Sequence, residues 1–438
     1  MASATVVRMR REATIVLLAM LVASCNTPRV QIRRIADHGD IAGALRMYHS
    51  HVQERGAPNA DALADVALAV LRRAAESTDV RDRNAGFSAL RTLGTRARDV
   101  FGAIANEPGA VGDRATSALY ELDGRDGPPP QRLILAVGTS DPERIVAGLV
   151  AIDARHDVQT LIRALSSEWP DVRRAAAMHL SRYRGDHEAT HALAEQALHD
   201  ADDMVRAACI TALGNHAAAG VDAIVHALDD PQLMVRLVAI WALAQASPAE
   251  AHTHFAPWLN DTHDPMSALE AAHALVAHGD GDAVHFVIAA LDSPREDLRS
   301  QAAVAASSLP ERYLDLIAPQ IEAADVEVRI RIAGRFATRD AYRTRVIRAL
   351  RPVSLRPDPI VAVRALEVLA EAGDPEAAGP LRGALASPDN TVRRVAVLAW
   401  SHLAGTSGET DPLAPLLEDH DRSIRLMAAA EIVRIASR

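Results

Sequence analysis

The fold is decided by a pattern that is clearest in residues 387–400, which read Ser387-Pro388-Asp389-Asn390-Thr391-Val392-Arg393-Arg394-Val395-Ala396-Val397-Leu398-Ala399-Trp400. A Ser-Pro-Asp turn leads into a valine and an arginine, and an alanine and a large apolar residue follow at helical spacing. Apolar residues at offsets of three and four form one continuous stripe along a helix. Asp389 stands four residues before Arg393, at an N-cap position where a carboxylate can accept free N–H groups of the first turn. The stretch therefore predicts a turn followed by an amphipathic helix.

The same pattern returns along the chain every 30 to 33 residues. Its arginine position falls at residues 173, 206, 236, 268, 299, 329, 362, 393 and 425. Alanine replaces the arginine at Ala268 and Ala362, and weaker copies are centred on Arg83, Gly112 and Ile145. A further helical pattern precedes each turn, so one unit is a helical hairpin. Because helices this short cannot bury their apolar stripes alone, the units are expected to stack on one another.

These hairpins resemble HEAT repeats of the short type that is also found in phycobilisome lyases. The resemblance covers residues 77–438, about eleven or twelve units, of which residues 77–127 are degenerate copies and residues 131–438 the regular stack. It implies an all-α fold, an α-solenoid. It also implies a ladder of contacts between adjacent repeats, formed by the turn aspartate and the arginine of the second helix. The arginines that match this ladder are Arg173, Arg206, Arg236, Arg299, Arg329, Arg393 and Arg425.

Such a ladder requires the arginine to be present in each repeat. At Gly112, Ala268 and Ala362 the arginine is missing, so the ladder should be interrupted and the stack should bend or loosen there. The alternative is that the arginine stripe contacts an anionic ligand, and a structural ladder is the favoured reading.

Residues 31–76 follow a different pattern. They read as a helical hairpin that resembles one tetratricopeptide-like unit, and they are predicted to form a cap, because an uncapped solenoid end exposes apolar surface. The stretch 123–130, Asp-Gly-Arg-Asp-Gly-Pro-Pro-Pro, is rich in residues that break helices. It is predicted to be a rigid spacer between two solenoid segments.

Residues 1–24 are predicted to be a lipoprotein signal peptide. Three arginines precede an apolar run at residues 13–23, which is too short to span a bilayer permanently. The run ends in Leu21-Val22-Ala23-Ser24-Cys25, which resembles the lipobox of bacterial lipoproteins. That resemblance implies cleavage after Ser24 and acylation of Cys25, with residues 25–30 as the lipidated tether. Asn26 is not the aspartate that favours inner-membrane retention, so the expected location is the outer membrane, facing the periplasm. The alternative is a signal anchor with a chance cysteine.

Charge and composition exclude several classes of function. All 47 basic residues are arginine, which excludes lysine-based chemistry, and the formal net charge is −10. Removal of residues 1–24 takes away three arginines and one glutamate, so the net charge becomes −12. A net acidic chain is a poor candidate for nucleic-acid binding. Cys209 would be the only free thiol after acylation of Cys25, and it stands at the small-residue position of its repeat, where burial is expected.

The sequence contains no nucleophile elbow, phosphate loop or dinucleotide fingerprint, so neither enzymatic activity nor a cofactor is predicted. The one His-Glu pair, His187-Glu188, cannot build the di-iron centre of the hydroxylase branch of the HEAT family. Six of the 18 histidines lie in residues 252–285. His252 and His254 have a spacing that can hold a metal from an extended segment, and His263 is the third candidate ligand. The alternative is that these histidines are ordinary polar surface residues.

The sequence therefore predicts a non-catalytic scaffold in the cell envelope, tethered to the membrane through Cys25. It would bind a protein or peptide partner along the concave surface of the solenoid. The alternative is an envelope protein that binds a metal or small ligand through residues 252–285. The charge of the concave face would indicate the partner, because a groove lined by arginine favours acidic partners and a neutral Ala/Leu groove favours an apolar peptide.

Overall fold

The computed structural model describes residues 27–260 and 264–437. The regular structure of these residues is helical throughout, and none of them lies in a strand, which confirms the all-α solenoid prediction. No helix in this part of the chain is both long and apolar enough to cross a bilayer. The chain forms two compact units. Unit 1 combines the N-terminal residues up to Val100 with Gly373–Arg438, and unit 2 is Phe101–Ala372.

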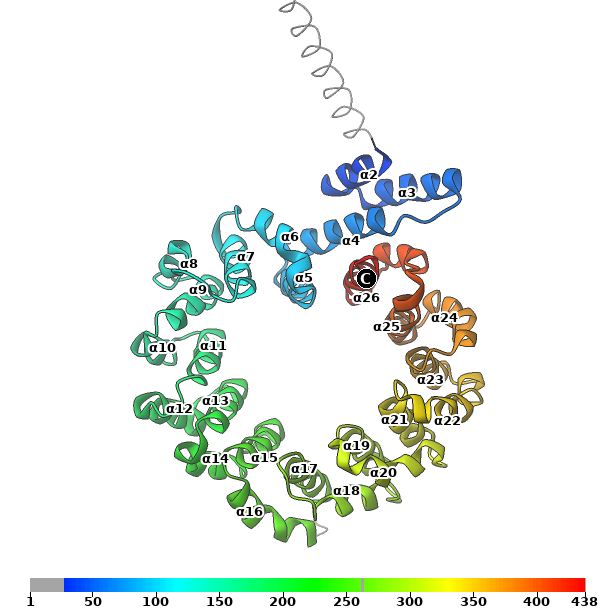
Figure 1. The fold of residues 1–438 in the computed structure, drawn as a ribbon. Coiled ribbons are helices and arrows are strands. Elements are labelled where there is room, and N and C mark those ends of the chain that lie inside the picture. Colours follow the sequence, from blue (N-terminus) through cyan, green and yellow to red (C-terminus); the bar gives the residue numbers. More distant parts are fainter. Residues whose placement is uncertain (1–26, 261–263, 438) are drawn as a thin grey trace, which may run out of the picture. The chain divides into compact units, whose positions relative to one another are not determined.

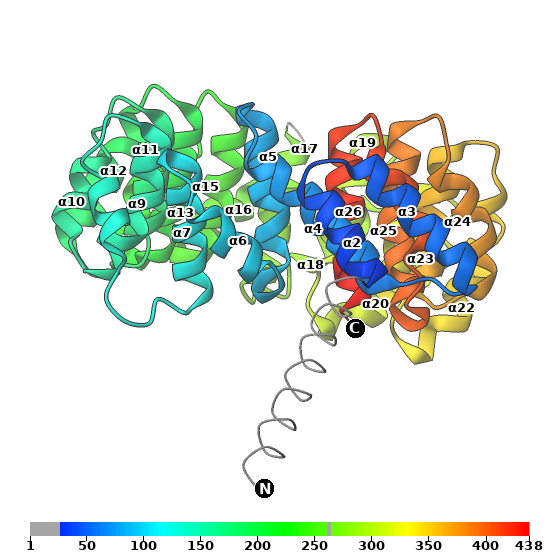
Figure 2. The ribbon, with the colours of Figure 1, turned by 90° about the horizontal axis from the view of Figure 1, so that it is seen from above.

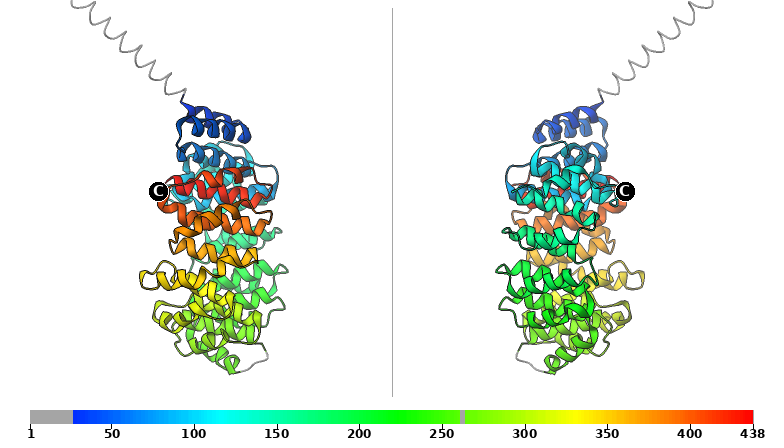
Figure 3. Two further views of the ribbon diagram at one scale, coloured as in Figure 1. Left: turned by 90° about the vertical axis from the view of Figure 1, so that its right-hand side faces the viewer. Right: turned by 90° about the vertical axis from the view of Figure 1, so that its left-hand side faces the viewer.

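Unit 2 consists of two rows of helices, which Figure 1 shows side by side. The second helices of the hairpins form the inner row, in which each helix packs against the next. They are α7 (Gly109–Leu122), α9 (Pro142–Ala154), α11 (Pro170–Leu180), α13 (Asp203–Asn215), α15 (Leu233–Ala246), α17 (Pro265–Ala277), α19 (Glu296–Ser307), α21 (Val326–Phe336) and α23 (Pro359–Glu371). The views in Figure 3 show these helices lying across the direction in which the repeats follow one another.

The first helices of the hairpins form the outer row of unit 2. They are α8 (Gln131–Ala136), α10 (Val158–Ala164), α12 (His187–His199), α14 (Val221–Ala227), α16 (Pro248–Asn260), α18 (Val284–Ala290), α20 (Leu314–Ile317) and α22 (Asp340–Leu350). Short 3-10 turns complete this row at η2 (Ala217–Gly220), η3 (Glu311–Tyr313), η4 (Ala318–Glu322) and η5 (Val353–Leu355). Helix α6 (Arg98–Ile104) includes the boundary between unit 1 and unit 2.

The core of the stack follows the repeat pattern. The position three residues after the ladder arginine has no exposed surface in any regular repeat, and its occupants are Ala176, Cys209, Ala239, Ala271, Ala302, Ile332, Ala365, Ala396 and Ala428. Most of these side chains are small, so neighbouring inner helices can approach closely. Larger aliphatic side chains fill the rest of the core, and each one that is fully buried contributes about 1.5–3 kcal/mol. This packing explains why the chain has few aromatic residues.

Aspartates begin most of the inner helices. Asp202, Asp325, Asp389 and Asp421 each accept a hydrogen bond from a backbone N–H of the first turn, which confirms the N-caps predicted from their spacing. Such a cap stabilises a helix by about 1 kcal/mol. The caps therefore fix where each second helix starts, and with it the position of the arginine four residues later.

Unit 1 brings together the first and the last helices of the described chain. Its N-terminal part contains α2 (Pro28–Asp37), α3 (Ile41–Arg55), α4 (Ala60–Ala75), α5 (Val80–Thr92) and η1 (Gly94–Ala97). Its C-terminal part contains η6 (Pro375–Ala377), α24 (Ala378–Leu385), α25 (Asn390–Ser407), η7 (Asp411–Glu418) and α26 (Arg422–Ala436). Figure 2 shows the blue N-terminal helices beside the red and orange C-terminal ones.

The N-terminal helices of unit 1 cover the last repeat. Helices α4 and α5 pack against α26, and α3 packs against η7. The Tyr48 hydroxyl donates a hydrogen bond to Asp411, and Arg422 Nη1 donates one to Asp82 Oδ1 at 2.8 Å. The α4–α5 hairpin therefore follows α26 in space as a further repeat would, although the two are far apart in sequence.

The helix-breaking stretch 123–130 is a loop inside unit 2. Helices α7 and α9, on either side of it, pack against each other. Arg125 in this loop donates a hydrogen bond to Asp153 of α9 at 2.6 Å, and Tyr120 donates to the carbonyls of Arg125 and Gly127 at 3.3 Å. The loop is thus held against α9 and against the end of α7, from which it leads into α8.

Candidate functional site

The ladder arginines of the inner row form ion pairs with the turn of the following repeat. In three pairs the guanidinium contacts both oxygens of an aspartate, through Nε and Nη2, at 2.7–3.0 Å. This two-point geometry is the strong form of an arginine–carboxylate hydrogen bond. We call each of them a ladder pair: Arg173–Asp200, Arg206–Asp230 and Arg393–Asp419. Arg299 makes a simpler contact, from Nε to the N-cap Asp325 at 2.9 Å.

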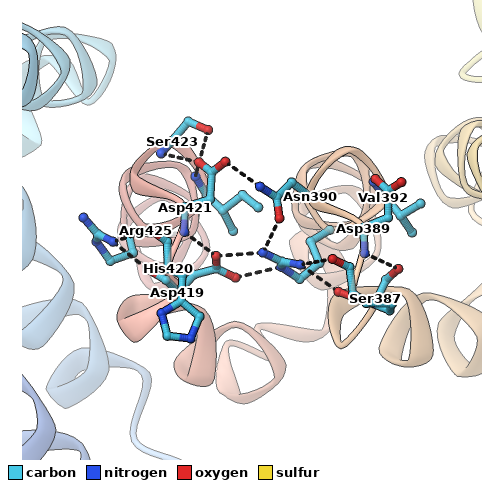
Figure 4. A network of polar contacts seen from close by, with 12 residues as sticks. Ser387, Asp389, Asn390, Val392, Asp419, His420, Asp421, Ser423 and Arg425 are labelled. Carbon is cyan, nitrogen blue, oxygen red and sulfur yellow. Dashed lines mark hydrogen bonds and ion pairs between the residues drawn. The ribbon is translucent and has the colours of Figure 1, made fainter.

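Each ladder arginine also clamps its own turn. In the ladder pair of unit 1, Arg393 Nη1 donates to the carbonyls of Ser387 at 2.8 Å and Pro388 at 3.1 Å, while its other edge holds Asp419. Figure 4 shows the two turns that are joined, which carry Ser387 and Asp419. Nη1 donates to the carbonyl six residues earlier in the same way in Arg83, Arg173, Arg206, Arg236, Arg299 and Arg425. The guanidinium thus joins two consecutive turns, which is a structural role.

The electrostatics of the ladder pairs keep the aspartates charged. The hydrogen bond from Arg206 holds the pKa of Asp230 below its ordinary value, although burial works in the other direction. Burial tends to raise the pKa of Asp419, but the hydrogen bonds from Arg393 and from the Asp421 backbone outweigh it and lower the pKa. The side chain of Asp419 is only 6% exposed, so loss of its arginine would leave a nearly buried charge without a partner.

Three ladder arginines lack a carboxylate partner among the residues that the structure describes. They are Arg236, Arg329 and Arg425. Arg329 donates from Nε to the carbonyl of Ala323 at 2.7 Å instead. The ladder expected from the sequence is thus interrupted: unit 2 has Arg173–Asp200, Arg206–Asp230 and Arg299–Asp325, and unit 1 has Arg393–Asp419.

Other polar contacts join the helices where the sequence lacks a ladder arginine. At Gly112 the guanidinium of Arg132, from helix α8, takes the place of the missing one: it pairs with the fully buried Asp113 and donates to the carbonyls of Ala105 at 2.6 Å and Glu107 at 2.5 Å. At Ala362 the neighbouring Arg364 of α23 contacts Glu327 of α21. At these two positions the sequence predicted an interruption of the ladder. The helices are joined there by contacts of another kind.

A third link lies near Ala268, on the inner face of α15, α17 and α19. Glu270 accepts hydrogen bonds from Trp241 Nε1 at 3.3 Å and from Gln301. The His273 ring stands edge-on to Trp241, with the ring centres 4.8 Å apart, and its Nε2 lies 2.6 Å from the Ser308 hydroxyl. Burial lowers the pKa of His273, so the ring is neutral at physiological pH. Glu270 therefore joins α15, α17 and α19 through these side-chain contacts.

The predicted metal ligands are not brought together by the described residues. His252 and His254 both lie in helix α16, where side chains two positions apart point in different directions, so the extended backbone assumed for their spacing is absent. His252 Nδ1 lies 2.6 Å from Asp280 Oδ2, and His263 falls outside the described residues. Residues 27–260 and 264–437 hold no group of three or more histidine, cysteine or acidic side chains that could bind a metal ion.

Of the two cysteines, the structure describes only Cys209. Cys25, the predicted lipidation site, lies outside the described residues. Cys209 of α13 is fully buried, and burial raises the pKa of its thiol to about 12. Cys209 therefore stays protonated and acts as a small packing residue, as its repeat position predicted.

A groove between α21 and α23 stands out from the rest of unit 2. Its volume is about 450 Å³. Three of its arginines follow one another at helical spacing on and just after α21, and the fourth comes from α23. We call it the arginine groove and define it by Arg331, Arg335, Arg339 and Arg364. Val368, Glu367 and Glu371 line its other side.

Four arginines of this groove share two glutamates. Arg331 and Arg364 both contact Glu327, at 3.3 and 2.7 Å. Arg335 and Arg339 both reach Glu311 Oε1, at 3.7 and 2.5 Å. The Nε atoms of Arg331, Arg335 and Arg339 are buried and have no hydrogen-bond partner within residues 27–260 and 264–437. Arg331 and Arg335 stand four residues apart on α21, a spacing at which like charges cost about 0.2–0.5 kcal/mol.

The sequence around the groove is strongly basic, a feature that is separate from the repeat pattern. Residues 326–356 contain nine arginines and two acidic residues, a net charge of +7 in a chain of −10. A count of charge along the chain would have found this segment. The pairing of Arg132 with Asp113, by contrast, joins two repeats through positions that have no fixed place in the repeat pattern.

Known proteins resemble this chain only distantly in overall sequence and structure. No curated protein matches the chain in sequence. Among solved structures, an X-ray structure of E. coli YibA is 17% identical, over 65% of this chain and 95% of that one, with a TM-score of 0.30. Kap121p and a Kap121p mutant are 14% and 13% identical, each over 86% of this chain and 50% of theirs, with TM-scores of 0.34 and 0.33.

A family model described as HEAT repeats decides the assignment. It matches residues 139–214, 192–276, 221–308 and 346–434, which together make up more than half of the chain. The matched segments contain the ladder pairs and most of the inner row described above. The chain therefore belongs to the HEAT-repeat family.

Proposed function

We propose that this protein is a non-catalytic scaffold of the cell envelope, tethered by lipid at Cys25, that binds an acidic segment of a partner protein in the arginine groove. HEAT-repeat solenoids commonly serve as protein-interaction scaffolds. They recognise partners through an extended, preformed surface. The groove supplies such a surface with a definite charge, which favours acidic partners over apolar peptides.

The observation that carries this proposal is the row of incompletely paired arginines. Their Nε atoms are buried without acceptors, while their side chains keep 28–35% exposure toward the groove. A carboxylate in the groove would reduce the repulsion between the guanidinium groups and accept hydrogen bonds from their exposed Nη atoms. Glu327 and Glu311 are each shared by two of the arginines, so a carboxylate of the ligand would add an acceptor for these side chains.

The partner segment would be a flexible acidic stretch that lies along α21. Glu367 and Glu371 line the α23 side of the groove and would repel it. Because of this repulsion, the acidic side chains of the partner would lie over Arg331, Arg335 and Arg339. An apolar residue between the acidic ones would fit against Val368 and Ile330, which also line the groove.

A peptide-binding experiment tests the groove. The probe is a ten-residue peptide of alternating glutamate and alanine, and its glutamine counterpart serves as the uncharged control. We expect the acidic peptide to bind, to weaken with added salt, and to lose roughly tenfold in affinity when Arg331→Gln and Arg335→Gln are combined. Equal binding of the glutamine peptide, or an unchanged affinity of the double variant, would refute acidic recognition.

A matched variant controls for the overall loss of positive charge. Arg343 and Arg348 lie on α22, in the outer row, and each is already paired with an acidic residue. The double variant Arg343→Gln/Arg348→Gln changes the net charge by the same amount as the groove variant. It should bind the acidic peptide as the unaltered protein does.

The membrane tether rests on the sequence of residues 1–25. A charged segment, an apolar run and a small-residue site before Cys25 occur together. Several acyl chains would give stable anchoring, because each buried methylene contributes about 0.8 kcal/mol. Cys25→Ser should abolish labelling with a fatty-acid analogue and release the protein from membranes, and Cys209→Ser should do neither. Continued membrane association of Cys25→Ser would refute the tether.

A further inference from the structure

Unit 1 contains a cavity of about 520 Å³ between α4, the turn after it, and α26. Its apolar wall consists of Ile41, Val70, Leu417 and Leu426. Its polar wall contains three arginines, two acidic residues and two hydroxyl residues, namely Arg73, Arg422, Arg425, Glu76, Asp82, Ser77 and Thr78. We call it the Arg425 cavity.

The turn that borders this cavity has the geometry of a HEAT turn. Asp79 is the N-cap of α5 and accepts a hydrogen bond from the N–H of Asp82 at 2.9 Å. Arg83 Nη1 donates to the carbonyls of Ser77 at 2.8 Å and Thr78 at 3.2 Å. Arg393 makes the same two contacts with its own turn. The α4–α5 hairpin therefore presents to α26 the kind of turn that α26 presents to α25.

One component is missing from this otherwise regular step. In every ladder pair the aspartate stands six residues before the arginine of its own repeat, as Asp419 stands before Arg425. Six residues before Arg83 the chain has Ser77. A serine hydroxyl is too short and carries no charge, so the position that a carboxylate would occupy opposite Arg425 is open.

Arg425 has one edge of its guanidinium available. Its Nη1 donates to the carbonyls of Asp419 at 2.6 Å and His420 at 3.2 Å, and no described residue accepts from its Nε or Nη2. In the ladder pairs these two atoms hold the carboxylate. The same edge of the same kind of arginine thus binds a carboxylate elsewhere in this molecule.

The acidic residues of the cavity are already engaged. Glu76 accepts from Arg72 Nε at 2.8 Å, and Asp82 accepts from Arg422 Nη1 at 2.8 Å. Arg73 donates to the carbonyl of Gly39 at 2.6 Å. The three arginines and two acidic residues of the lining leave one net positive charge in the cavity. Among the described residues neither Arg73 nor Arg425 contacts a carboxylate, since both donate only to backbone carbonyls.

We propose that the Arg425 cavity binds a carboxylate that carries an apolar group. The carboxylate would accept hydrogen bonds from Nε and Nη2 of Arg425, in the geometry of Asp419 on Arg393, and the apolar group would lie against Val70, Leu417 and Leu426. A free carboxylic acid and the C-terminus of a peptide share this chemistry. The site is separate from the arginine groove of unit 2 and does not depend on the function proposed there.

Calorimetric titration of the purified protein with two pairs of probes tests the site. One pair is octanoate and octanamide, and the other is acetyl-Ala-Ala-Leu with a free and with an amidated C-terminus. We expect at least one acid to bind, roughly tenfold more tightly than its amide. Preference for octanoate would identify a free carboxylic acid as the source, and preference for the tripeptide would identify a peptide C-terminus.

Two variants decide whether Arg425 is responsible. Arg425→Gln removes the donor edge, and Ser77→Asp supplies an internal carboxylate that competes with the probe. Both should weaken binding of the preferred acid by roughly tenfold or more. Ser77→Asn, which adds size without charge, should retain clearly more of the binding than Ser77→Asp. Failure of both acids to bind, equal binding of acid and amide, or unchanged binding to Ser77→Asp would overturn the proposal.

Discussion

Two consecutive steps of unit 1 use the same arginine in different ways. Between α25 and α26, Arg393 clamps its own turn and also holds Asp419 of the next turn. Between α26 and α5, Arg425 clamps its own turn, but Ser77 stands where the aspartate would be. The two contacts are therefore separable. The turn clamp needs only backbone carbonyls, whereas the link between repeats needs a carboxylate on the neighbour.

The same separation is visible along the sequence. An aspartate stands six residues before the arginine position in the repeats that follow Arg173, Arg206 and Arg393. A serine stands there in the repeats that follow Ala268 and Ala362, at Ser293 and Ser387. In these repeats the carboxylate is present only where the preceding helix supplies an arginine. Arg425 has the arginine without an aspartate at this position. The same holds for Arg236, Arg299 and Arg329, where the following repeats have Thr262, Ala323 and Arg356.

Removing the arginine should have the largest effect where the carboxylate is present. Arg393→Gln leaves the nearly buried Asp419 without a partner and should destabilise unit 1 by about 3 kcal/mol. Arg425→Gln loses only hydrogen bonds to carbonyls and should cost about 1 kcal/mol. Hydrogen exchange of the backbone amides of α25 and α26 measures both. Equal losses would show that the carboxylate contributes nothing.

The substitute arginine at Gly112 gives a second test within unit 2. A Cβ at Gly112 would collide with the carbonyl oxygen of Glu107 and with the guanidinium of Arg132. Gly112→Ala should therefore destabilise unit 2 by about 2 kcal/mol, measured by urea unfolding. Gly102 lies in a helix and has open space around it, so Gly102→Ala should stabilise by about 0.5–1 kcal/mol. A stabilised Gly112→Ala variant would contradict the close packing of Arg132.

The contact between Tyr48 and Asp411 tests whether the first helices hold the last ones. Tyr48 is fully buried, and burial together with the hydrogen bond to Asp411 raises the pKa of its hydroxyl. Tyr48→Phe should destabilise unit 1 by about 1.5 kcal/mol and speed hydrogen exchange in η7 and α26. Tyr120→Phe, which removes a buried hydroxyl from unit 2, is the control and should leave exchange in α26 unchanged.

The acid dependence of stability should follow the ladder pairs and is the smallest of these effects. The pKa of Asp419 is lowered in the folded protein, so its contribution is present above the pKa of an unfolded aspartate, near 4, and is lost as the pH falls through the folded pKa. Arg393→Gln should therefore reduce the loss of stability in unit 1 between pH 5 and pH 3, measured by urea unfolding. An unchanged pH dependence would mean that Asp419 gains nothing from Arg393.

Much of this organisation can be predicted from short stretches of the sequence. The repeat spacing, the N-cap aspartates and the arginine position each depend on residues within one turn of one another, and they predicted the hairpins correctly. The spacing of Asp389 and Arg393 is an example, because both belong to the same helix start. The fold class follows from summing such local signals.

The candidate sites depend on contacts that have no local signal. The packing of α4 and α5 on α26 joins residues 340 positions apart, as Arg422 and Asp82 show. The role of Asp419 was also missed, because the aspartates were noted as N-caps four residues before the arginine and the ladder partner stands six before it. Metal binding by His252 and His254 was inferred for extended backbone, and the helix there separates the two side chains.

Helix α5 follows α26 as the next repeat, with an open ladder position between Arg425 and Ser77. A double-mutant cycle on unfolding free energies tests this arrangement, using Ser77→Asp and Arg425→Gln alone and together. We predict that Ser77→Asp stabilises unit 1 by about 1 kcal/mol in the presence of Arg425 and has no stabilising effect in its absence. Equal effects of Ser77→Asp with and without Arg425 would contradict the account.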